Sequence, residues 1–407
     1  MTTTGSPLRR ALGHRRFRSF FAARTISQWG DTFSTVALVI LVYRLTGSGI
    51  KVAGTVGFEI APVLMFGFVA GTLVDRWPRL RLMIIADLCR AGIAAGLAVF
   101  HTDLAVIYAA AFALSAFNVV FNPAAASLVP ALVGPDDVVG ANSAVWSAAV
   151  VSQIALAPAA GGLVALAGAA PAFAINAASF LASAALLARL SVPRYRVDHV
   201  RSWRAELGAG LSAIRRCRFL ATLAVTQALA ALSAGATSAL LVVLAQRHLH
   251  SGAGRFGLLL GAIGVGAGIG PLLLQRFVRD VRRPGWLFGP YFLRGAVDLT
   301  LASTSSFAAG LGALAAYGMG TSTGNITYNS VLQTTVDDTI RGRVFTAFDI
   351  IWQSFRLLSI VVGGVLADKL GITSVYVLGG ALLLGAGLLG SICSGPIEHH
   401  KQTPSGA

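Results

Sequence analysis

The sequence predicts an all-α membrane protein with twelve transmembrane helices, arranged as two pseudo-symmetric six-helix bundles. Composition is the first reason: 55% of the 407 residues are hydrophobic and only 12% are charged, against about 25% charged residues in soluble proteins. Apolar stretches of about 18 or more residues also recur along the chain, each long enough to cross a bilayer as a helix. These unbroken runs lack the alternation of a transmembrane barrel, which leaves helices as the spanning elements. The third reason is a repeat of about half the chain length.

Charged or Gly- and Pro-containing turns separate the apolar runs, so each run can be given approximate limits. The predicted spans are residues 19–43, 52–74, 82–101, 104–128, 142–167, 171–190, 219–245, 256–275, 286–303, 307–332, 346–368 and 373–394.

The longest polar stretch follows the sixth run and divides the chain into two halves that look related. At an offset of about 202 residues, Arg16-Phe17 falls on Arg218-Phe219 and Gly161-Gly162 falls on Gly363-Gly364. A shared register near half the chain length indicates a duplicated six-helix unit, as found in secondary transporters. The predicted domains are an N-terminal bundle (1–190), a cytoplasmic linker (191–218), and a C-terminal bundle with a short cytoplasmic tail (219–407).

The formal net charge of +16 is large enough to raise the question of a nucleic-acid partner. The basic residues, however, gather in short clusters at the ends of apolar runs and form no basic face. Most of the 32 Lys and Arg residues fall on one side of the membrane when both termini are placed in the cytoplasm. The positive-inside rule therefore predicts a multi-pass membrane protein with both termini in the cytoplasm and no nucleic-acid partner. The basic N-terminus leads into a full-length span without a cleavable signal pattern.

The segment Gly71–Arg81, GTLVDRWPRLR, concentrates charge between two spans. Dense charge between apolar runs of that length indicates a short turn exposed to water. Pro78 favours a tight reversal there, because proline fixes φ and removes a donor.

This segment resembles the cytoplasmic loop between helices 2 and 3 of the major facilitator superfamily, and the twelve-helix plan is similar over nearly the whole chain. The segments SQWGDTFSTVAL (27–38), GTLVDRWPRLRLMIIADLCRA (71–91) and RGRVF (341–345) are similar to the bacterial exporter branch with the enterobactin exporter and the macrolide efflux proteins. The loop departs from the family pattern at Pro78, where a glycine is usual. The resemblance implies the major facilitator fold, a place in the bacterial cytoplasmic (inner) membrane, and secondary active transport of a small molecule by alternating access.

A second stretch bears on the direction of transport. The sequence around Pro158, Gly161 and Gly162 is similar to the GPxxGG motif of drug/proton antiporters of the superfamily, although Ala157 replaces its first glycine. The resemblance implies export. The alternative is a proline kink with small residues that let helices pack closely.

Two acids within the spans are candidates for proton coupling, because an acid at the bilayer centre costs about 2.5–3.5 kcal/mol on insertion scales and calls for a partner or a function. Asp31 lies near mid-depth in the first span, which lines the central cavity in the family. It either carries a proton or pairs statically with Arg24 two turns away. Glu59 is either a second coupling residue or a structural group near Pro62.

The charges at the cytoplasmic ends of the spans are predicted to gate the inner side. In the family, the loop acid engages basic groups and the start of a second-half helix, which implies pairing of Asp75 with Arg341 or Arg343. Asp87 and Arg90, at i and i+3, can pair directly. The predicted gating residues are Gly71, Asp75, Arg76, Arg79, Arg81, Asp87, Arg90, Arg341 and Arg343.

Polar and aromatic side chains concentrate in spans 4, 7 and 10, which line the cavity in the family. Such groups suit an amphipathic organic molecule, although polar side chains can also hold helices together. Asp349 and Gln353 of span 11 either line the cavity or lock the two halves. The predicted substrate-binding residues are Gln28, Phe117, Asn118, Phe121, Asn122, Gln227, Tyr317, Thr321, Asn325, Tyr328, Asp349 and Gln353.

Motifs for catalysis, metal binding or ATP binding were not found in the sequence, so we expect no enzyme activity, no metal, no cofactor and no use of ATP. The 3 cysteines are too few and too scattered for a disulfide framework or a metal site. The expected activity is proton-coupled efflux, by a monomer in contact with membrane lipid, of small amphipathic molecules such as drugs, macrolides or siderophore-like metabolites. The alternatives are a lysophospholipid or lipid translocator, a scaffold without transport, and an uptake carrier working by proton symport.

Overall fold

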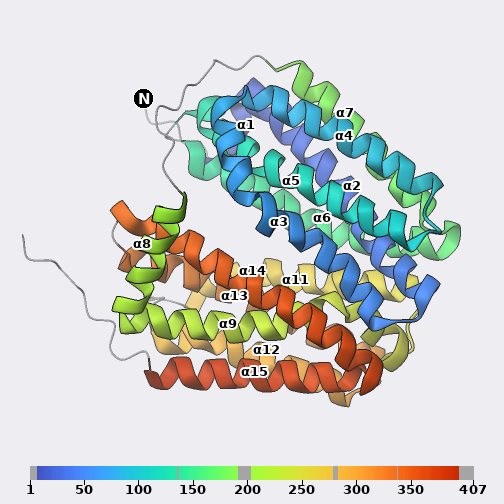
Figure 1. Ribbon diagram of the computed structural model, residues 1–407, viewed down its shortest axis with the longest axis vertical. Helices are drawn as coiled ribbons and strands as arrows, with labels where there is room; N and C mark the ends of the chain where they lie inside the picture. Colours follow the sequence, from blue (N-terminus) through green and yellow to red (C-terminus); the bar gives the residue numbers. More distant parts are fainter. Residues whose placement is uncertain (1–6, 135–136, 191–202, 278–282, 337, 394–407) are drawn as a thin grey trace, which may run out of the picture. The chain divides into compact units, whose positions relative to one another are not determined.

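The computed structural model describes residues 7–134, 137–190, 203–277, 283–336 and 338–393, and these ranges are helical apart from short connections (Figure 1). The first helices are α1 (Pro7–Gly13), α2 (Arg15–Thr46), α3 (Gly49–Arg76), α4 (Arg79–Val99), α5 (Leu104–Val133), α6 (Val138–Ala167) and α7 (Ala170–Ala188). The remaining ones are α8 (Trp203–Arg216), α9 (Arg218–Ala239), α10 (Leu241–Val243), the π-helical turn η2 (Leu244–His248), α11 (Ala253–Phe277), α12 (Pro284–Ser303), α13 (Phe307–Thr335), α14 (Asp338–Lys369) and α15 (Ile372–Cys393).

The all-helical fold class is confirmed. Among the described residues, 10 helices are long and apolar enough to cross a membrane. α12 and α13 are not among these ten, and both are more polar than a typical span. α12 carries the buried charged residues Arg294 and Asp298, and α13 carries the polar stretch that begins at Tyr317. Each predicted span falls on a helical segment, and the number of segments that cross the membrane stays a prediction.

The contacts divide the chain into two compact units. Unit 1 consists of Met1–Val200 with Ala239–Gly264, and unit 2 of Arg201–Ser238 with Val265–Ala407. α11 therefore begins in one unit and ends in the other. The predicted domain limits at 190 and 218 stay a prediction.

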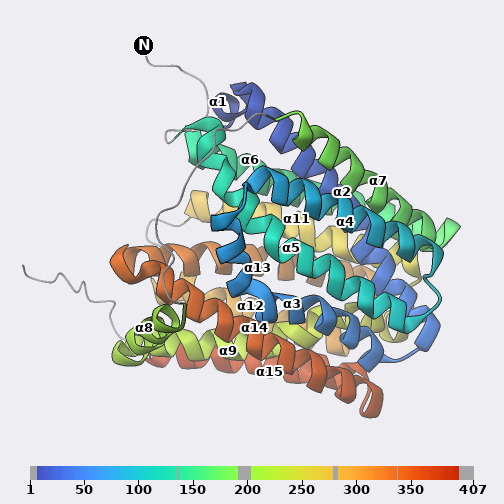
Figure 2. The same cartoon turned by 45° about the horizontal axis from the view of Figure 1, so that its top comes forward.

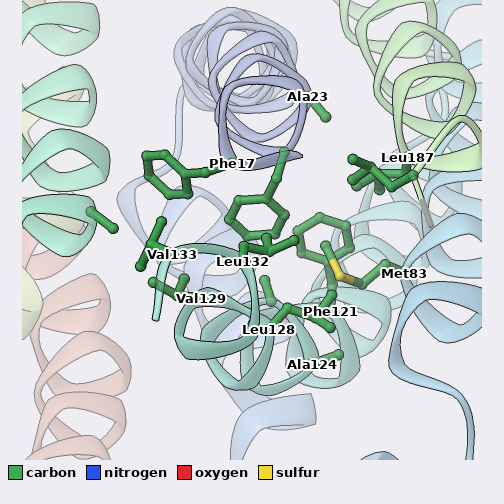
Figure 3. Close-up of a cluster of buried hydrophobic side chains, with 14 of the residues drawn as sticks. Phe17, Ala23, Met83, Phe121, Ala124, Leu128, Val129, Leu132, Val133 and Leu187 are labelled. Atoms are coloured by element: carbon green, nitrogen blue, oxygen red, sulfur yellow. The ribbon is translucent and has the colours of Figure 1, made fainter. Parts of the chain in front are cut away.

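In unit 1, α2 packs against α6 and α7, α4 packs against α5 and α7, and α3 packs against α5. A large apolar cluster ties one end of these helices together around Phe17, Met83 and Phe121 (Figure 3). Gly47 ends α2 with φ +62°, and its amide donates to the carbonyl of Tyr43 at 2.8 Å. A left-handed residue in this position favours glycine, which explains where the helix stops. After α3, the residues Trp77 and Pro78 make the tight turn expected from the sequence.

A short N-terminal helix, α1, precedes the first span and was not expected from the sequence. Its Ala11 is fully buried in the apolar cluster of unit 1. Asp137, at the start of α6, accepts a hydrogen bond from Arg10 Nε at 3.0 Å and lies 3.1 Å from His14 Nε2. The hydrogen bonds from His14 and Arg10 lower the pKa of the Asp137 carboxyl. This carboxylate therefore holds α1 and the start of α2 against α6.

Replacing Asp137 with Asn is expected to loosen α1. Because the folded pKa is lowered, the attraction is fully present above the ordinary carboxyl pKa and is lost as pH falls through the folded value. The amides of α1 in the wild-type protein should thus show high protection factors at neutral pH and lower protection factors in strong acid, each taken relative to the intrinsic exchange rate at the same pH. The Asn variant should exchange faster already at neutral pH, with α4 unchanged as internal control. Equal exchange in the two proteins at neutral pH would contradict this role.

In unit 2, α12 packs against α13 and α15, and α14 packs against α8 and α15 (Figure 2). Small residues allow the closest of these contacts. A Cβ on Gly380 would lie 2.9 Å from the carbonyl oxygen of Gly295, so α12 and α15 touch through their backbones. An apolar cluster around Phe288, Tyr291 and Leu383 fills the space beside this contact.

Part of the predicted linker is helical. Residues 191–202 lie outside the described residues, but α8 occupies most of the rest of the linker. Its Ile214 is buried in a cluster with Leu332, Val344 and Phe348, and Gly210 meets the backbone of Arg343 at the start of α14. The polar sequence hid this helix because, among the side chains described at positions 208–216, few are buried: Gly210 and Ile214.

Candidate functional site

A cavity of about 250 Å³ lies within unit 2, between α9, α12, α13 and α14. α13 supplies neutral polar groups, whereas α12 and α14 supply most of the aromatic and charged ones. The lining residues are Gln227, Pro290, Tyr291, Arg294, Thr321, Gly324, Asn325, Tyr328, Asn329, Phe345, Phe348, Asp349 and Trp352.

The polar side chains of α13 form two groups: those whose hydroxyls are hydrogen-bonded within the helix, and those that reach the cavity. The hydroxyls of Thr321, Thr323 and Thr327 donate to backbone carbonyls of the preceding turn, at 2.8 to 3.0 Å. The hydrogen-bond donors of these hydroxyls are therefore satisfied within their own helix. Asn325 and Tyr328 reach the cavity, where the Tyr328 ring meets Phe348 edge-to-face with centroids 5.7 Å apart. The cavity thus presents aromatic edges next to neutral hydrogen-bonding groups, a combination that suits an amphipathic molecule.

Five of the predicted substrate-binding residues line this cavity together: Gln227, Thr321, Asn325, Tyr328 and Asp349. Two others of unit 2 lie beside it. The Tyr317 hydroxyl accepts a hydrogen bond from Arg294 Nη2 at 3.1 Å. The Gln353 Oε1 is buried and has no hydrogen-bond partner among the described residues.

Several lining residues were not assigned to a cavity from the sequence. Tyr291 and Arg294 on α12 are three residues apart, and Phe345, Phe348 and Trp352 recur on α14 at spacings of three and four. Residues at these spacings share one face of a helix. The repeated aromatic residues beside Asp349 were therefore a usable signal. Their orientation toward the cavity depends on helix rotation, which periodicity alone leaves open.

In unit 1, Asp31 lies half-buried on α2. Arg24 and Asp31 are both described, and they do not form an ion pair, so the static-pair alternative is wrong. Asn176 of α7 faces Asp31, and its Nδ2 is buried without a hydrogen-bond partner within the described ranges. The neighbouring Trp29 donates from Nε1 to Ser152 Oγ of α6 at 2.7 Å. Asp31 is thus an acid in a membrane helix beside neutral polar groups, with the buried pair Asp87 and Arg90 of α4 near enough to act on it electrostatically.

Asp87 and Arg90 form the predicted pair on α4, and both are buried, with 0% and 1% of the residue exposed. Ser183 Oγ of α7 donates to Asp87 Oδ2 at 2.7 Å. Arg90 also donates to Asn118 Oδ1, and its guanidinium lies 4.3 Å from the centre of the Phe121 ring. Asn118 and Phe121, which the sequence suggested for substrate, therefore lie in the Arg90 cluster.

The other predicted residues of unit 1 are dispersed. Phe117 is half-buried and packs against the large apolar cluster, Asn122 is exposed, and Gln28 is half-buried on α2. Glu59 is half-buried on α3, which continues through Pro62. Their assignment to substrate or proton binding stays a prediction.

The predicted gating residues are only partly described. Gly71, Asp75 and Arg76 lie in α3, but their side chains fall outside the described residues. Arg79 Nη1 donates to the carbonyl of Ser127 at 3.2 Å, and Arg81 is exposed. In unit 2, Arg341 Nη2 donates to the carbonyl of Val336 at 3.2 Å and Arg343 is half-buried. The proposed partnership of Asp75 with these arginines stays a prediction.

Comparison with known proteins assigns the chain to a family. The profile of the major facilitator superfamily (MFS) family described as "Transmembrane secretion effector" matches residues 2–406. The chain belongs to this family. It is a multi-pass membrane transporter of the MFS type, and its relatives are transporters, not enzymes. It is also 27% identical over 394 residues to the uncharacterised MFS-type transporter YfiS of Bacillus subtilis (strain 168), with 91% of each chain covered.

Solved structures with the same fold include distant transporters. One is a bacterial homologue of the iron transporter ferroportin in the inward-facing state (17% identity, 94% of this chain and 99% of that chain, TM-score 0.73). Another is a bacterial homologue of the human lysosomal transporter Spinster (11% identity, 93% and 96%, TM-score 0.72). At these identities the likeness shows the fold alone. In the described part of this transporter, no group of three or more His, Cys, Asp or Glu side chains is placed to hold a metal.

The antiporter-like stretch of this MFS transporter lies in α6, where its two glycines differ in their surroundings. A Cβ on Gly161 would lie 2.6 Å from the carbonyl oxygen of Ala253 and 2.9 Å from the Cα of Gly257, both in α11. A Cβ on Gly162 would meet nothing within 4 Å. Pro158 contributes to the same contact, because Gly257 and Gly261 approach it closely. Gly161 thus has a packing role that Gly162 lacks.

Replacing each glycine with alanine should affect the stability of the protein differently at the two positions. Gly161→Ala forces two backbones apart and is expected to lower the free energy of unfolding by about 1–3 kcal/mol, as overpacking does. Gly162→Ala places its methyl group in open space and should leave stability unchanged or slightly raised, since alanine favours helix. Thermal denaturation of both purified variants in detergent measures the difference. A similar loss in the two variants would contradict the packing role of Gly161.

Proposed function

We propose that this transporter is a proton-coupled exporter of small amphipathic organic molecules, working by alternating access in the bacterial cytoplasmic membrane with both termini in the cytoplasm. Drugs, macrolides and siderophore-like metabolites are the candidate cargo, in keeping with the sequence resemblance to the enterobactin exporter and macrolide efflux branch. Asp31 is the proposed proton carrier, with Glu59 as a second candidate.

The observation that carries the proposal is the environment of Asp31. A carboxylate in a membrane helix is costly unless it is paired, and Asp31 has no cation within ion-pair distance in the described part of the chain. Its neighbours on α6 and α7 are neutral, namely Ser152 and Asn176, and the charged residues that act on it, Asp87 and Arg90 of α4, are paired with each other. Such surroundings favour the neutral acid when the site is dry and ionisation when water enters. This alternation is what a proton carrier needs.

Two further observations support export of an amphipathic substrate. The cavity of unit 2 combines aromatic side chains with Gln227, Asn325 and the Tyr328 hydroxyl. The family description, secretion, is also in keeping with outward transport.

Efflux measured against a controlled proton gradient tests the proposal. Inside-out membrane vesicles that contain the protein and have an acidic interior should accumulate a fluorescent amphipathic dye from the medium. An uncoupler, which dissipates the proton gradient, should abolish this accumulation. Accumulation that ignores the uncoupler would argue against proton coupling. Movement of fluorescent lysophospholipid between leaflets without any gradient would favour a lipid translocator. Dye entry driven by a proton gradient in the opposite direction would favour uptake by symport.

A further inference from the structure

Two charged residues of α12, Arg294 and Asp298, are buried one turn apart without forming an ion pair. They are 8% and 1% exposed, and neither is among the ion pairs of the described residues. Asp298 Oδ2 accepts a hydrogen bond from Ser233 Oγ at 3.2 Å, whereas Oδ1 is buried without a partner in the described part of the chain. Arg294 Nη2 donates to the Tyr317 hydroxyl at 3.1 Å, and its Nε is likewise buried without one. Both groups are therefore incompletely satisfied.

The surroundings of Asp298 favour its neutral form. An ionised carboxylate buried at that depth needs a cation or several donors, and Asp298 has one hydroxyl donor. The ionisable and polar groups that face it from the neighbouring helices are Arg294 on α12, Ser233 and Thr237 on α9, and Tyr376 on α15. The Tyr376 hydroxyl donates to the carbonyl of Thr237 at 2.7 Å and so does not bind the carboxylate.

Arg294 consequently brings to the cavity wall a positive charge without an ion-pair partner among the described residues, and Asp349, the acid on the same wall, is not paired with it. A guanidinium stays protonated at all physiological pH values. Its partners are the Tyr317 hydroxyl and the face of the Tyr317 ring, 4.9 Å from Cζ to the ring centre. Arg294 also lines the cavity beside Tyr291 and Asn325. An arginine held in place by an aromatic ring, next to neutral hydrogen-bonding groups, is suited to bind a carboxylate.

We propose that Arg294 binds an anionic group, a carboxylate, of the amphipathic substrate, and that the proton on Asp298 keeps the arginine available for it. This inference rests on the proposed function, because it names the substrate class of the same cavity. When Asp298 loses its proton, the new carboxylate competes for Arg294 from one turn away. Anion binding and protonation of Asp298 are therefore linked, and the anion should bind more weakly as Asp298 ionises with rising pH.

Equilibrium binding to the full-length protein in detergent tests the proposal with three probes of one ring system. These are 1-naphthoate, 1-naphthylmethanol and 1-naphthylmethylammonium, compared by calorimetry. Naphthoate should bind about tenfold to a hundredfold more tightly than the alcohol, as expected for hydrogen bonds to a charged group. Arg294→Gln should abolish this preference, and Arg294→Lys should keep much of it. Arg276→Gln, an exposed position at the end of α11, serves as the control and should bind as the wild type does.

The Asp298→Asn variant tests the proton linkage. Naphthoate affinity of the wild type should fall as pH rises, whereas the Asn variant should keep the acid-pH affinity throughout. Naphthoate bound no more tightly than the alcohol, unchanged binding by Arg294→Gln, or no naphthoate binding at all would each overturn the proposal. If Arg294→Gln does not elute as a folded protein, the pH profile of Asp298→Asn decides, and a profile equal to that of the wild type overturns it. No proton gradient is applied in these binding measurements. A failure of proton-driven efflux therefore does not affect the binding result, and a failure of naphthoate binding does not affect the efflux result.

Discussion

Replacing Arg90 with Gln is expected to lower the free energy of unfolding by about 3–5 kcal/mol, the range found when one partner of a buried ion pair is removed. The change leaves Asp87 fully buried with only the Ser183 hydroxyl as a donor. It also removes the cation that lies over the rings of Phe121 and Phe180, at 4.3 and 4.4 Å. Loss of these contacts should separate α4 from α5 and α7. Denaturant titration of the purified protein in detergent provides the measurement.

Two companion variants make the result interpretable. Arg81→Gln changes an exposed arginine of the same helix and should alter stability by less than about 0.5 kcal/mol. The double variant Asp87→Asn, Arg90→Gln removes both charges, so it should recover part of the stability lost in the single variant. A double variant that is as unstable as the sum of the two single ones would show that the pair makes no coupled contribution.

The second large effect concerns transport. Asp31→Asn is expected to reduce gradient-driven accumulation of dye to the level of vesicles without the protein, because the amide matches the carboxyl in shape but cannot release a proton. Exchange of dye across vesicles without a gradient should continue, since binding and the conformational change need no proton transfer in that assay. Asp103→Asn is the matched control: this exposed residue caps α5 by accepting a hydrogen bond from Ala105 N at 2.8 Å, and asparagine also caps helices.

Normal accumulation by Asp31→Asn would remove Asp31 from the mechanism. The same assay on Glu59→Gln would then identify the remaining candidate. Loss of both accumulation and exchange in the Asn variant would instead indicate a folding or binding defect, which size-exclusion chromatography distinguishes.

The fold was predictable because membrane-spanning helices require long apolar runs, which are recognisable in the sequence. Each predicted span falls on a helical segment. The helices that lie outside such runs were missed. α1 is too short to show a period, and α8 lies in a polar stretch where few of the described side chains are buried. The family also followed from the sequence, since the charge pattern at Gly71–Arg81 and the twelve runs together resemble the superfamily.

Side-chain partners were much less predictable than helices. Asn118 and Phe121 looked like cavity residues because they are polar or aromatic within a span, yet both contact Arg90. Arg24 and Asp31 share a helix face but do not form an ion pair. Conversely, the residues of α14 that line the cavity have an ordinary amphipathic spacing. Which face of a helix meets a cavity depends on packing with other helices, and a single sequence does not encode that locally.

The division into units has a consequence for cutting the protein into fragments. Unit 1 needs Ala239–Gly264 in addition to its first 200 residues, and this segment supplies the backbone that Gly161 touches and the Arg247 side chain, whose Nε donates to the Tyr43 hydroxyl at 2.8 Å. A fragment that ends in the linker would therefore lack a part of its own unit. Two fragments divided at the linker should consequently be stable only when they are produced together. Joint production of such fragments would allow the transporter to be assembled from separately labelled pieces.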